Sequence, residues 1–144
     1  MATRRTATKQ FKAGLAMRKK VMGEEYVDRS FANTDAFWMP FQEILTESAW
    51  GGIWTRPGLD PKTRSMLTVA MCIALNRPNE VKIHLRGAIR NGCTPLEIRE
   101  MVLHSFVYCG GPAALDAFHV IKEALPGILK AERAAAKRKS AKKT

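Results

Sequence analysis

The stretch RPNEVKIHLRGAIRNGCTPLE, residues 77–97, determines the fold class. It contains the stop and start signals of consecutive helices: a proline at its beginning, an Asn-Gly pair in its middle and a Thr-Pro pair near its end. The apolar positions between the proline and the Asn-Gly pair recur at helical spacing and form one predicted buried face: Val81, Leu85 and Ala88. The stretch therefore predicts two helices joined by a short turn.

Helix punctuation continues downstream of this stretch. Asn79 is the expected N-cap of the first helix, and Thr94 to Glu97 form a capping box for the second, which ends near Cys109. Gly110-Gly111 separates this helix from another, which is expected to begin at Pro112 and to end at Pro126-Gly127.

Helix signals upstream are more scattered. Helices are expected over residues 13–22 and about 34–48, with a kink or a late start at Pro40 in the second. Residues 49–59, AWGGIWTRPGL, hold glycines and a proline that interrupt a regular helix, and tryptophans that require burial. We expect a packed loop here. Asp60-Pro61 then begins a helix that ends at Arg77-Pro78.

No segment shows the alternation of β-branched and polar residues that marks a strand. We therefore predict an all-α, single-domain helical bundle of about six helices, joined by short connections. The 144 residues, 46% of them hydrophobic, suit one core. The expected boundaries are a basic flexible tail over residues 1–14, the helical domain over 15–128, and a basic Ala/Lys-rich tail over 129–144.

Net charge is concentrated near the two ends of the chain. The total is +11, of which residues 1–20 carry +7 and residues 130–144 carry +6, so the middle of the chain is slightly acidic. We therefore expect no nucleic-acid binding beyond weak, salt-dependent contacts of the tails, whose simpler role is to keep the protein soluble. No apolar run is long enough to span a membrane. The three cysteines show no CxxC spacing, so neither a disulfide framework nor a metal site is predicted, and a cytoplasmic location is the simplest expectation.

His84 is the most informative polar residue on the predicted buried face. Glu80 precedes it by four residues and can reach its ring, which should fix the tautomer and raise the pKa of the imidazole. Two interpretations follow from the spacing: a proton donor that acts near neutral pH, or a core histidine held by Glu80 for structure alone.

Further polar side chains could surround a small anion. Glu100, His104 and Tyr108 recur every four residues, either as a second wall of the same pocket or as an ordinary helix edge. The arginines near the apolar segments suit two-pronged binding of carboxylates, although each alone is more often a surface or interface residue: Arg56, Arg64 and Arg86. Trp54 is either a core or subunit-contact anchor or part of the substrate site.

Three segments carry a resemblance to a known family: residues 49–71, 80–104 and 107–118. They contain the motifs WGxIWxRPGLDxxTRS, HxRxAxxNG and YxGxPAA. In order and spacing they resemble the gamma-carboxymuconolactone decarboxylase family over about residues 15–125.

The resemblance implies an all-α subunit of the alkyl-hydroperoxidase type, assembled as trimers or hexamers. It also implies decarboxylation of 4-carboxymuconolactone to the enol-lactone of 3-oxoadipate, a step in protocatechuate breakdown that needs no cofactor. On this hypothesis His84 and Glu80 are catalytic, and Arg64, Arg86, Arg56, Tyr108 and Trp54 bind the substrate.

Two alternatives remain open at this level. A paralogue of the same fold could act on another lactone or on hydroperoxides, although Arg77 and Glu80 occupy the positions of the CxxC motif that the related peroxidases use. A polyanion-binding protein that acts through its basic tails is a third possibility.

Overall fold

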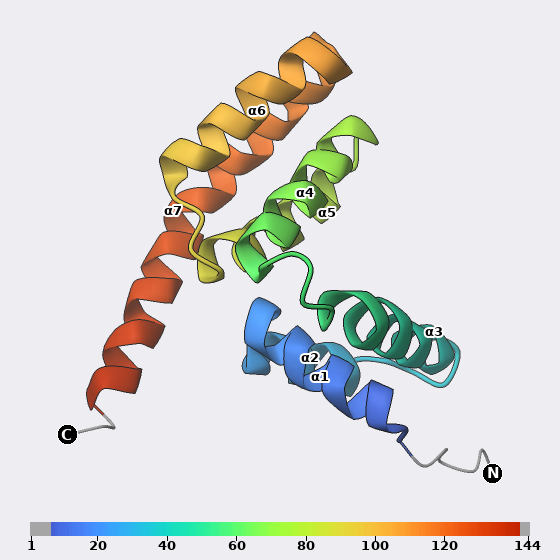
Figure 1. Ribbon diagram of the computed structural model, residues 1–144. Helices are drawn as coiled ribbons and strands as arrows, with labels where there is room; N and C mark the ends of the chain where they lie inside the picture. Colours follow the sequence, from blue (N-terminus) through green and yellow to red (C-terminus); the bar gives the residue numbers. More distant parts are fainter. Residues whose placement is uncertain (1–6, 142–144) are drawn as a thin grey trace. The chain divides into compact units, whose positions relative to one another are not determined.

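The computed structural model describes residues 7–141, and every regular element in this range is helical (Figure 1). The predicted all-α class is confirmed. The chain divides into two compact units, Met1–Asp60 and Pro61–Thr144, which are described here one at a time. None of the helices within residues 7–141 has the length and apolar character to cross a membrane.

The first unit contains three α-helices and a π-helix: α1 (Lys9–Met22), α2 (Glu24–Ala32), α3 (Met39–Ile44) and η1 (Leu45–Trp54). Its small core consists of Val21, Met22, Val27 and Trp50. Arg18 is also buried in this unit, where its guanidinium donates to Gln42 Oε1 at 2.8 Å and to Thr46 Oγ1 at 3.0 Å. Pro40 lies in the first turn of α3, so the late start is confirmed.

The packed loop predicted over residues 49–59 is wrong for its first half, because η1 continues through Trp54. The glycines serve close packing here. A Cβ on Gly14 of α1 would overlap the backbone of Thr46 and Gly51, and a Cβ on Gly51 would overlap the backbone of Gln10. Two glycines therefore allow α1 and η1 to approach backbone to backbone, and tertiary packing overrides the low helix propensity of glycine.

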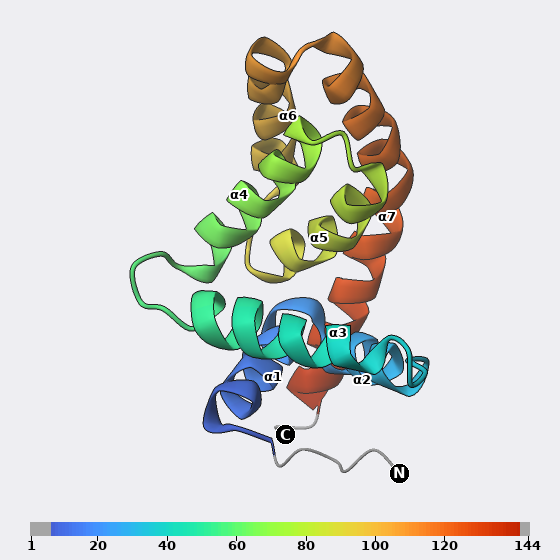
Figure 2. The same ribbon diagram turned by 90° about the vertical axis from the view of Figure 1, so that its right-hand side faces the viewer.

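The second unit contains four helices: α4 (Pro61–Ala74), α5 (Pro78–Arg90), α6 (Pro95–Cys109) and α7 (Gly111–Ala141). Figures 1 and 2 show α4 beside α5 and α6 beside α7. One apolar core joins all four helices: Val69, Ile73, Val81, Leu85, Ala88, Cys93, Ile98, Met101, Val102, Ala114, Ala117, Ile121 and Ile128.

The connections of the second unit largely follow the sequence signals. Gly92 and Gly110 adopt left-handed backbone angles, with φ of 94° and 87°, and the capping box of Thr94 and Glu97 is complete. The expected N-cap Asn79 is wrong. α5 already begins at Pro78, with Arg77 as its N-cap residue and no side-chain cap.

The predicted helix end at Pro126-Gly127 is also wrong, because α7 runs through both residues to Ala141. Proline removes one backbone donor, but packing continues on both sides of it. Ile128 is buried in the core, and Glu132 accepts two hydrogen bonds from Arg90 Nη1 of α5, at 2.9 and 3.1 Å.

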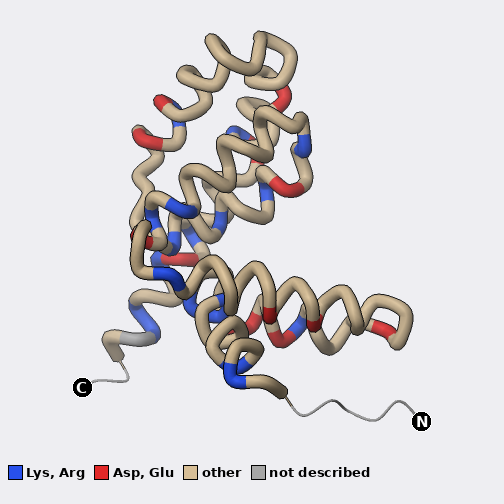
Figure 3. Tube along the Cα trace, turned by 45° about the vertical axis from the view of Figure 1, so that its right-hand side comes forward, with Lys and Arg blue, Asp and Glu red and all other residues tan. Residues whose placement is uncertain are grey.

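Both predicted tails enter these helices. Residues 9–14 belong to α1, which Thr8 caps by accepting a hydrogen bond from the Phe11 N–H, and residues 129–141 belong to α7. Lys and Arg recur along this last part of α7 (Figure 3). Residues 1–6 and 142–144, the outer parts of the two tails, lie outside the described residues.

We predict that Gly14→Ala lowers the free energy of unfolding by about 1–3 kcal/mol, because the new methyl group has no space between α1 and η1. Thermal unfolding followed by circular dichroism would measure the change. Gly58→Ala is the matched control, since its Cβ meets nothing within 4 Å and the change should leave the stability close to that of the wild type. Equal stability of all three proteins would contradict the close contact.

Candidate functional site

His84 lies on the side of α5 that faces α4. Asn91, two turns further along the same side of α5, donates from Nδ2 to Ser65 Oγ at 2.8 Å and to the Pro61 carbonyl at 3.3 Å, both on α4. Glu80, one turn before His84, also lies on this side. This side of α5 therefore packs against α4, and most of the surface of His84 is buried.

The facing side of α4 carries a short polar stripe. Arg64, Thr68 and Cys72 recur every four residues, beside the buried Ser65. Burial and, secondarily, the negative charge of Glu80 raise the pKa of the Cys72 thiol, which places the Glu80 carboxylate near the C-terminal end of α4. Because α4 and α5 run antiparallel, His84 faces the middle of this stripe.

The predicted rise in the pKa of His84 is wrong in sign. Burial lowers the pKa of the imidazole, and the charge of Glu80 opposes this effect only in part. The reason is that Glu80 itself is exposed, so water screens its charge, whereas the ring of His84 has lost most of its hydration. The resting subunit therefore holds His84 as a neutral imidazole at neutral pH.

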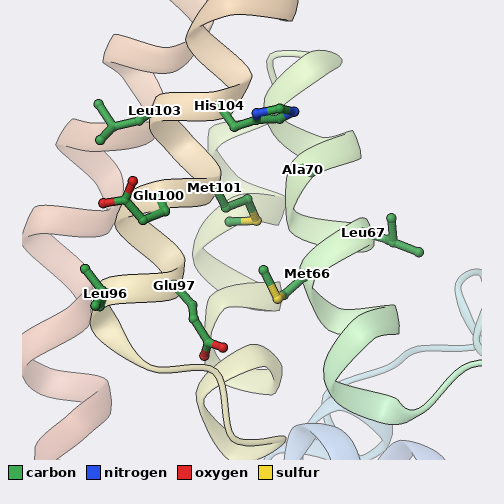
Figure 4. Close-up of a pocket in the computed structure, with 9 residues that line it drawn as sticks. All are labelled: Met66, Leu67, Ala70, Leu96, Glu97, Glu100, Met101, Leu103 and His104. Atoms are coloured by element: carbon green, nitrogen blue, oxygen red, sulfur yellow. The ribbon is translucent and has the colours of Figure 1, made fainter.

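The polar stripe of α6 lines a different hollow. A groove of about 710 Å³ lies between α4 and α6, and Glu100 and His104 are among its lining residues, whereas His84 is not. In Figure 4, Met66 and Met101 point toward one another across the groove, and His104 projects toward α4. Tyr108 stacks at a tilt on His104, with ring centroids 4.8 Å apart. The proposed second wall is therefore separated from His84 by α4.

The predicted arginines are spread over several positions. Arg64 lies in the first part of α4, partly buried, at the edge of the side that faces α5. Arg86 follows His84 by two residues, which is about 200° around the helix axis, so its exposed side chain leaves the opposite side of α5. Arg56 and Trp54 belong to the first unit, where Trp54 stacks on Trp50 with ring centroids 4.8 Å apart.

Sequence reasoning missed the residues that fix α4 relative to its neighbours. These are the Asn91–Ser65 contact and the Lys62–Glu97 ion pair, whose Nζ and Oε1 atoms lie 2.7 Å apart. Asn91 and Glu97 were interpreted only as helix-capping residues. Helical phase could have predicted the role of Asn91, since Asn91 lies on the same side of α5 as Glu80 and His84.

Comparison with known proteins gives this arrangement a family. Residues 40–123 match the model of the carboxymuconolactone decarboxylase family. The chain belongs to this family.

Two curated relatives extend the comparison. The chain is 48% identical over 115 residues to the nitrosuccinic acid decarboxylase of Metarhizium robertsii, covering 80% of each protein. It is 42% identical over 114 residues to the 4-carboxymuconolactone decarboxylase of Acinetobacter baylyi, covering 79% of this chain and 85% of the relative. Both are decarboxylases, and the protein is a carboxy-lyase of the carboxymuconolactone decarboxylase family.

The electrostatic account of His84 predicts the direction of a further shift. Glu80→Gln removes the charge that favours the imidazolium, so the pKa of His84 should fall below its wild-type value. NMR titration of the imidazole proton resonances would measure both values. Glu123→Gln, an exposed change on α7, is the matched control. A rise in the His84 pKa on loss of Glu80 would contradict the account.

Proposed function

We propose that this decarboxylase acts on 4-carboxymuconolactone, releasing CO₂ and the enol-lactone of 3-oxoadipate in protocatechuate catabolism, without a metal or an organic cofactor. The named relative in Acinetobacter baylyi, together with the three motifs, supports this substrate.

The chemistry of the lactone explains why no cofactor is needed. The departing carboxylate is attached to a carbon that a C=C bond connects to the lactone carbonyl. When the C–C bond to CO₂ breaks, the electron pair delocalises onto that carbonyl oxygen as a dienolate. The enzyme must hold the dianion, stabilise the dienolate and deliver one proton to carbon.

The burial of His84 is the observation that carries its role. An imidazole with a lowered pKa is neutral while the site is empty, and a bound dianion within about 4–6 Å raises that pKa again. Substrate binding therefore loads His84 with the proton that it gives to the dienolate after CO₂ has left. Glu80 assists, because its charge favours the same protonated form.

Arg64 is the carboxylate-binding residue that this site supports best, because it borders the side of α4 that faces His84. Arg56 and Trp54 remain candidates from the first unit. Arg86 and Tyr108 leave other sides of the second unit, so they reach a substrate bound at His84 only if it lies at a subunit boundary. We therefore retain them within a homo-oligomer, a trimer or a hexamer.

A second substrate is favoured by the 48% identity to the nitrosuccinic acid decarboxylase. Nitrosuccinic acid also carries two carboxylates, and its nitro group accepts the electron pair that the lactone carbonyl would otherwise accept. The same proton donor and carboxylate clamp therefore suit both substrates, and the shape of the site distinguishes a ring from an open chain.

A cytoplasmic location remains part of the proposal. Cys72, Cys93 and Cys109 are all free thiols, and Cys93 is buried in the core. Reduced cysteines of this kind suit a reducing compartment.

The substrate proposal predicts that purified protein releases CO₂ from 4-carboxymuconolactone in metal-free buffer, at a rate well above the uncatalysed one. Nitrosuccinic acid, assayed in parallel, would give the ratio of the two kcat/KM values. A higher kcat/KM for the lactone supports the first substrate. CO₂ release from nitrosuccinic acid alone would favour the second substrate. CO₂ release from neither compound would contradict both substrate proposals.

The proposed role of His84 predicts that His84→Asn lowers kcat by about 10²–10⁴-fold. His119→Asn is the matched control, because His119 is exposed on α7 and should leave kcat unchanged. Near-normal turnover of a folded His84→Asn protein would contradict the role.

Loading by substrate also predicts a specific pH dependence. kcat/KM should fall as the pH rises through the lowered pKa of free His84, below 6.5. kcat should fall only at higher pH, because the bound dianion raises the same pKa. A kcat/KM that increases with pH across this range would show that His84 acts as a base.

A further inference from the structure

The last part of α7 carries basic side chains that no acidic residue balances. Lys130, Arg133 and Lys137 are exposed, and within residues 7–141 no ion pair or hydrogen bond joins their side chains to a partner. Glu132 is the one acidic residue of this part of the helix, and it is already paired with Arg90 of α5. The positive charge of this part of α7 is therefore left for a partner outside the chain.

The three basic residues lie in one line along the helix. At 100° per residue, Lys130, Arg133 and Lys137 fall within about 60° of one another around the axis of α7 and span about 10 Å along it. All three also border one hollow of about 480 Å³, which residues of α7 line. We call these three residues the basic stripe.

The helix holds the basic stripe in a fixed arrangement. A flexible tail, as predicted from the sequence, would have to order its side chains and backbone on binding, at a cost in entropy. Here Ile128 is buried in the core and Glu132 is bonded to Arg90, so both anchor the part of α7 that carries the stripe. The last turns of α7 extend past α4, α5 and α6 of the second unit, with basic residues along them (Figures 1 and 3).

The basic stripe is separate from the proposed decarboxylation site. Glu132 faces α5, the helix that carries His84, and it lies about 160° around the axis of α7 from Lys130. The stripe therefore lies on the side of α7 that points away from α5. Its residues also follow residue 123, where the match to the family model ends.

The charge and length of the stripe suit a nucleic-acid duplex. A duplex carries about one phosphate charge per 1.7 Å of its axis, so about six phosphates lie along 10 Å. Lysine and arginine are the side chains that contact such phosphates, and the guanidinium of Arg133 can bind two phosphate oxygens at once. Contacts of this kind bind the backbone without reading the bases.

Other polyanions suit the stripe less well. Helices that lie on membranes insert large apolar side chains, but none of the described residues beyond Leu115 exposes one. Proteins that hold single strands stack bases on aromatic rings, but residues 119–141 contain no Phe, Tyr or Trp. Binding by charge alone is the mode that a duplex backbone supports best.

We propose that the basic stripe of α7 binds the phosphate backbone of a nucleic-acid duplex, independently of sequence. This binding is additional to decarboxylation and does not depend on which substrate the enzyme uses.

The first test follows the fluorescence anisotropy of labelled duplex DNA, and in parallel of duplex RNA, during titration with the full chain at several salt concentrations. The logarithm of the binding constant should fall linearly with the logarithm of the salt concentration, by about 0.9 per phosphate contact. The triple variant Lys130→Gln/Arg133→Gln/Lys137→Gln should bind more weakly and lose about 2–3 from this slope. Binding of either duplex supports the proposal, and the tighter of the two identifies the kind of nucleic acid.

The matched control is Lys9→Gln/Lys12→Gln/Lys20→Gln, which removes the same charge from exposed positions of α1. This control should keep a slope close to that of the wild type, with circular dichroism verifying that both triple variants remain helical. Equal losses in the two triple variants would show that net charge alone determines binding, and would overturn the proposal. Absence of duplex binding by the wild type at low salt would also overturn it, as would binding to phosphatidylserine vesicles but to neither duplex.

A rearrangement tests the line of charges at constant composition. The variant Lys130→Ala/Ala131→Lys/Ala136→Lys/Lys137→Ala keeps the net charge but moves two cations by about 100° around the axis of α7, to positions that are also exposed. Its slope should fall below that of the wild type, because these cations then leave the line. A slope equal to that of the wild type would overturn the assignment to the basic stripe.

Discussion

The hydrogen bonds from Asn91 to α4 are the constraint on which the proposed site depends. They join the C-terminal end of α5 to the first turn of α4, with Ser65 Oγ and the Pro61 carbonyl as acceptors. Gly92 immediately turns the chain with a φ of 94°, so α6 begins near the same end of α4. The Lys62–Glu97 ion pair then links α6 to α4 as well. α4 is therefore held between α5 and α6, and each of its two sides faces a different one of these helices.

One side of α4 determines the electrostatics of His84. Packing against α4 removes water from the imidazole, and that loss outweighs the charge of Glu80. A neutral, desolvated imidazole has a low affinity for a proton until an anion binds beside it. In our proposal the bound substrate raises the pKa of His84. The burial of His84 therefore couples substrate binding to proton delivery. The other side of α4 borders the groove between α4 and α6, which Met66 and Met101 line.

Local signals predicted some of the helix boundaries, although the expected N-cap Asn79 was wrong and α2 was not predicted. The capping box at Thr94 and Glu97 and the turn at Gly92 depend on a few neighbouring residues, and both are confirmed. Where distant contacts decide, prediction from sequence failed. α7 continues through Pro126 because Ile128 packs in the core and Glu132 accepts hydrogen bonds from Arg90 of α5.

The site shows the same division. Spacing correctly placed Glu80 one turn from His84, but spacing contains no information on hydration, so the sign of the pKa shift was wrong. Helical phase, by contrast, was available from the beginning: a separation of two residues already places Arg86 on the opposite side of α5 from His84. The glycines of η1 were interpreted as helix breakers because their close contact with α1 joins residues far apart in the chain.

The central claim is that substrate binding causes His84 to take up a proton, and proton uptake on binding can be measured directly. The saturated analogue of 4-carboxymuconolactone keeps both carboxylates but lacks the C=C bond, so it binds without reacting. Calorimetric titration at pH 7 in buffers of different ionisation enthalpy gives the number of protons taken up on binding. We predict uptake approaching one proton for the wild type and close to none for His84→Asn. Binding of the analogue to the wild type without proton uptake would contradict the account.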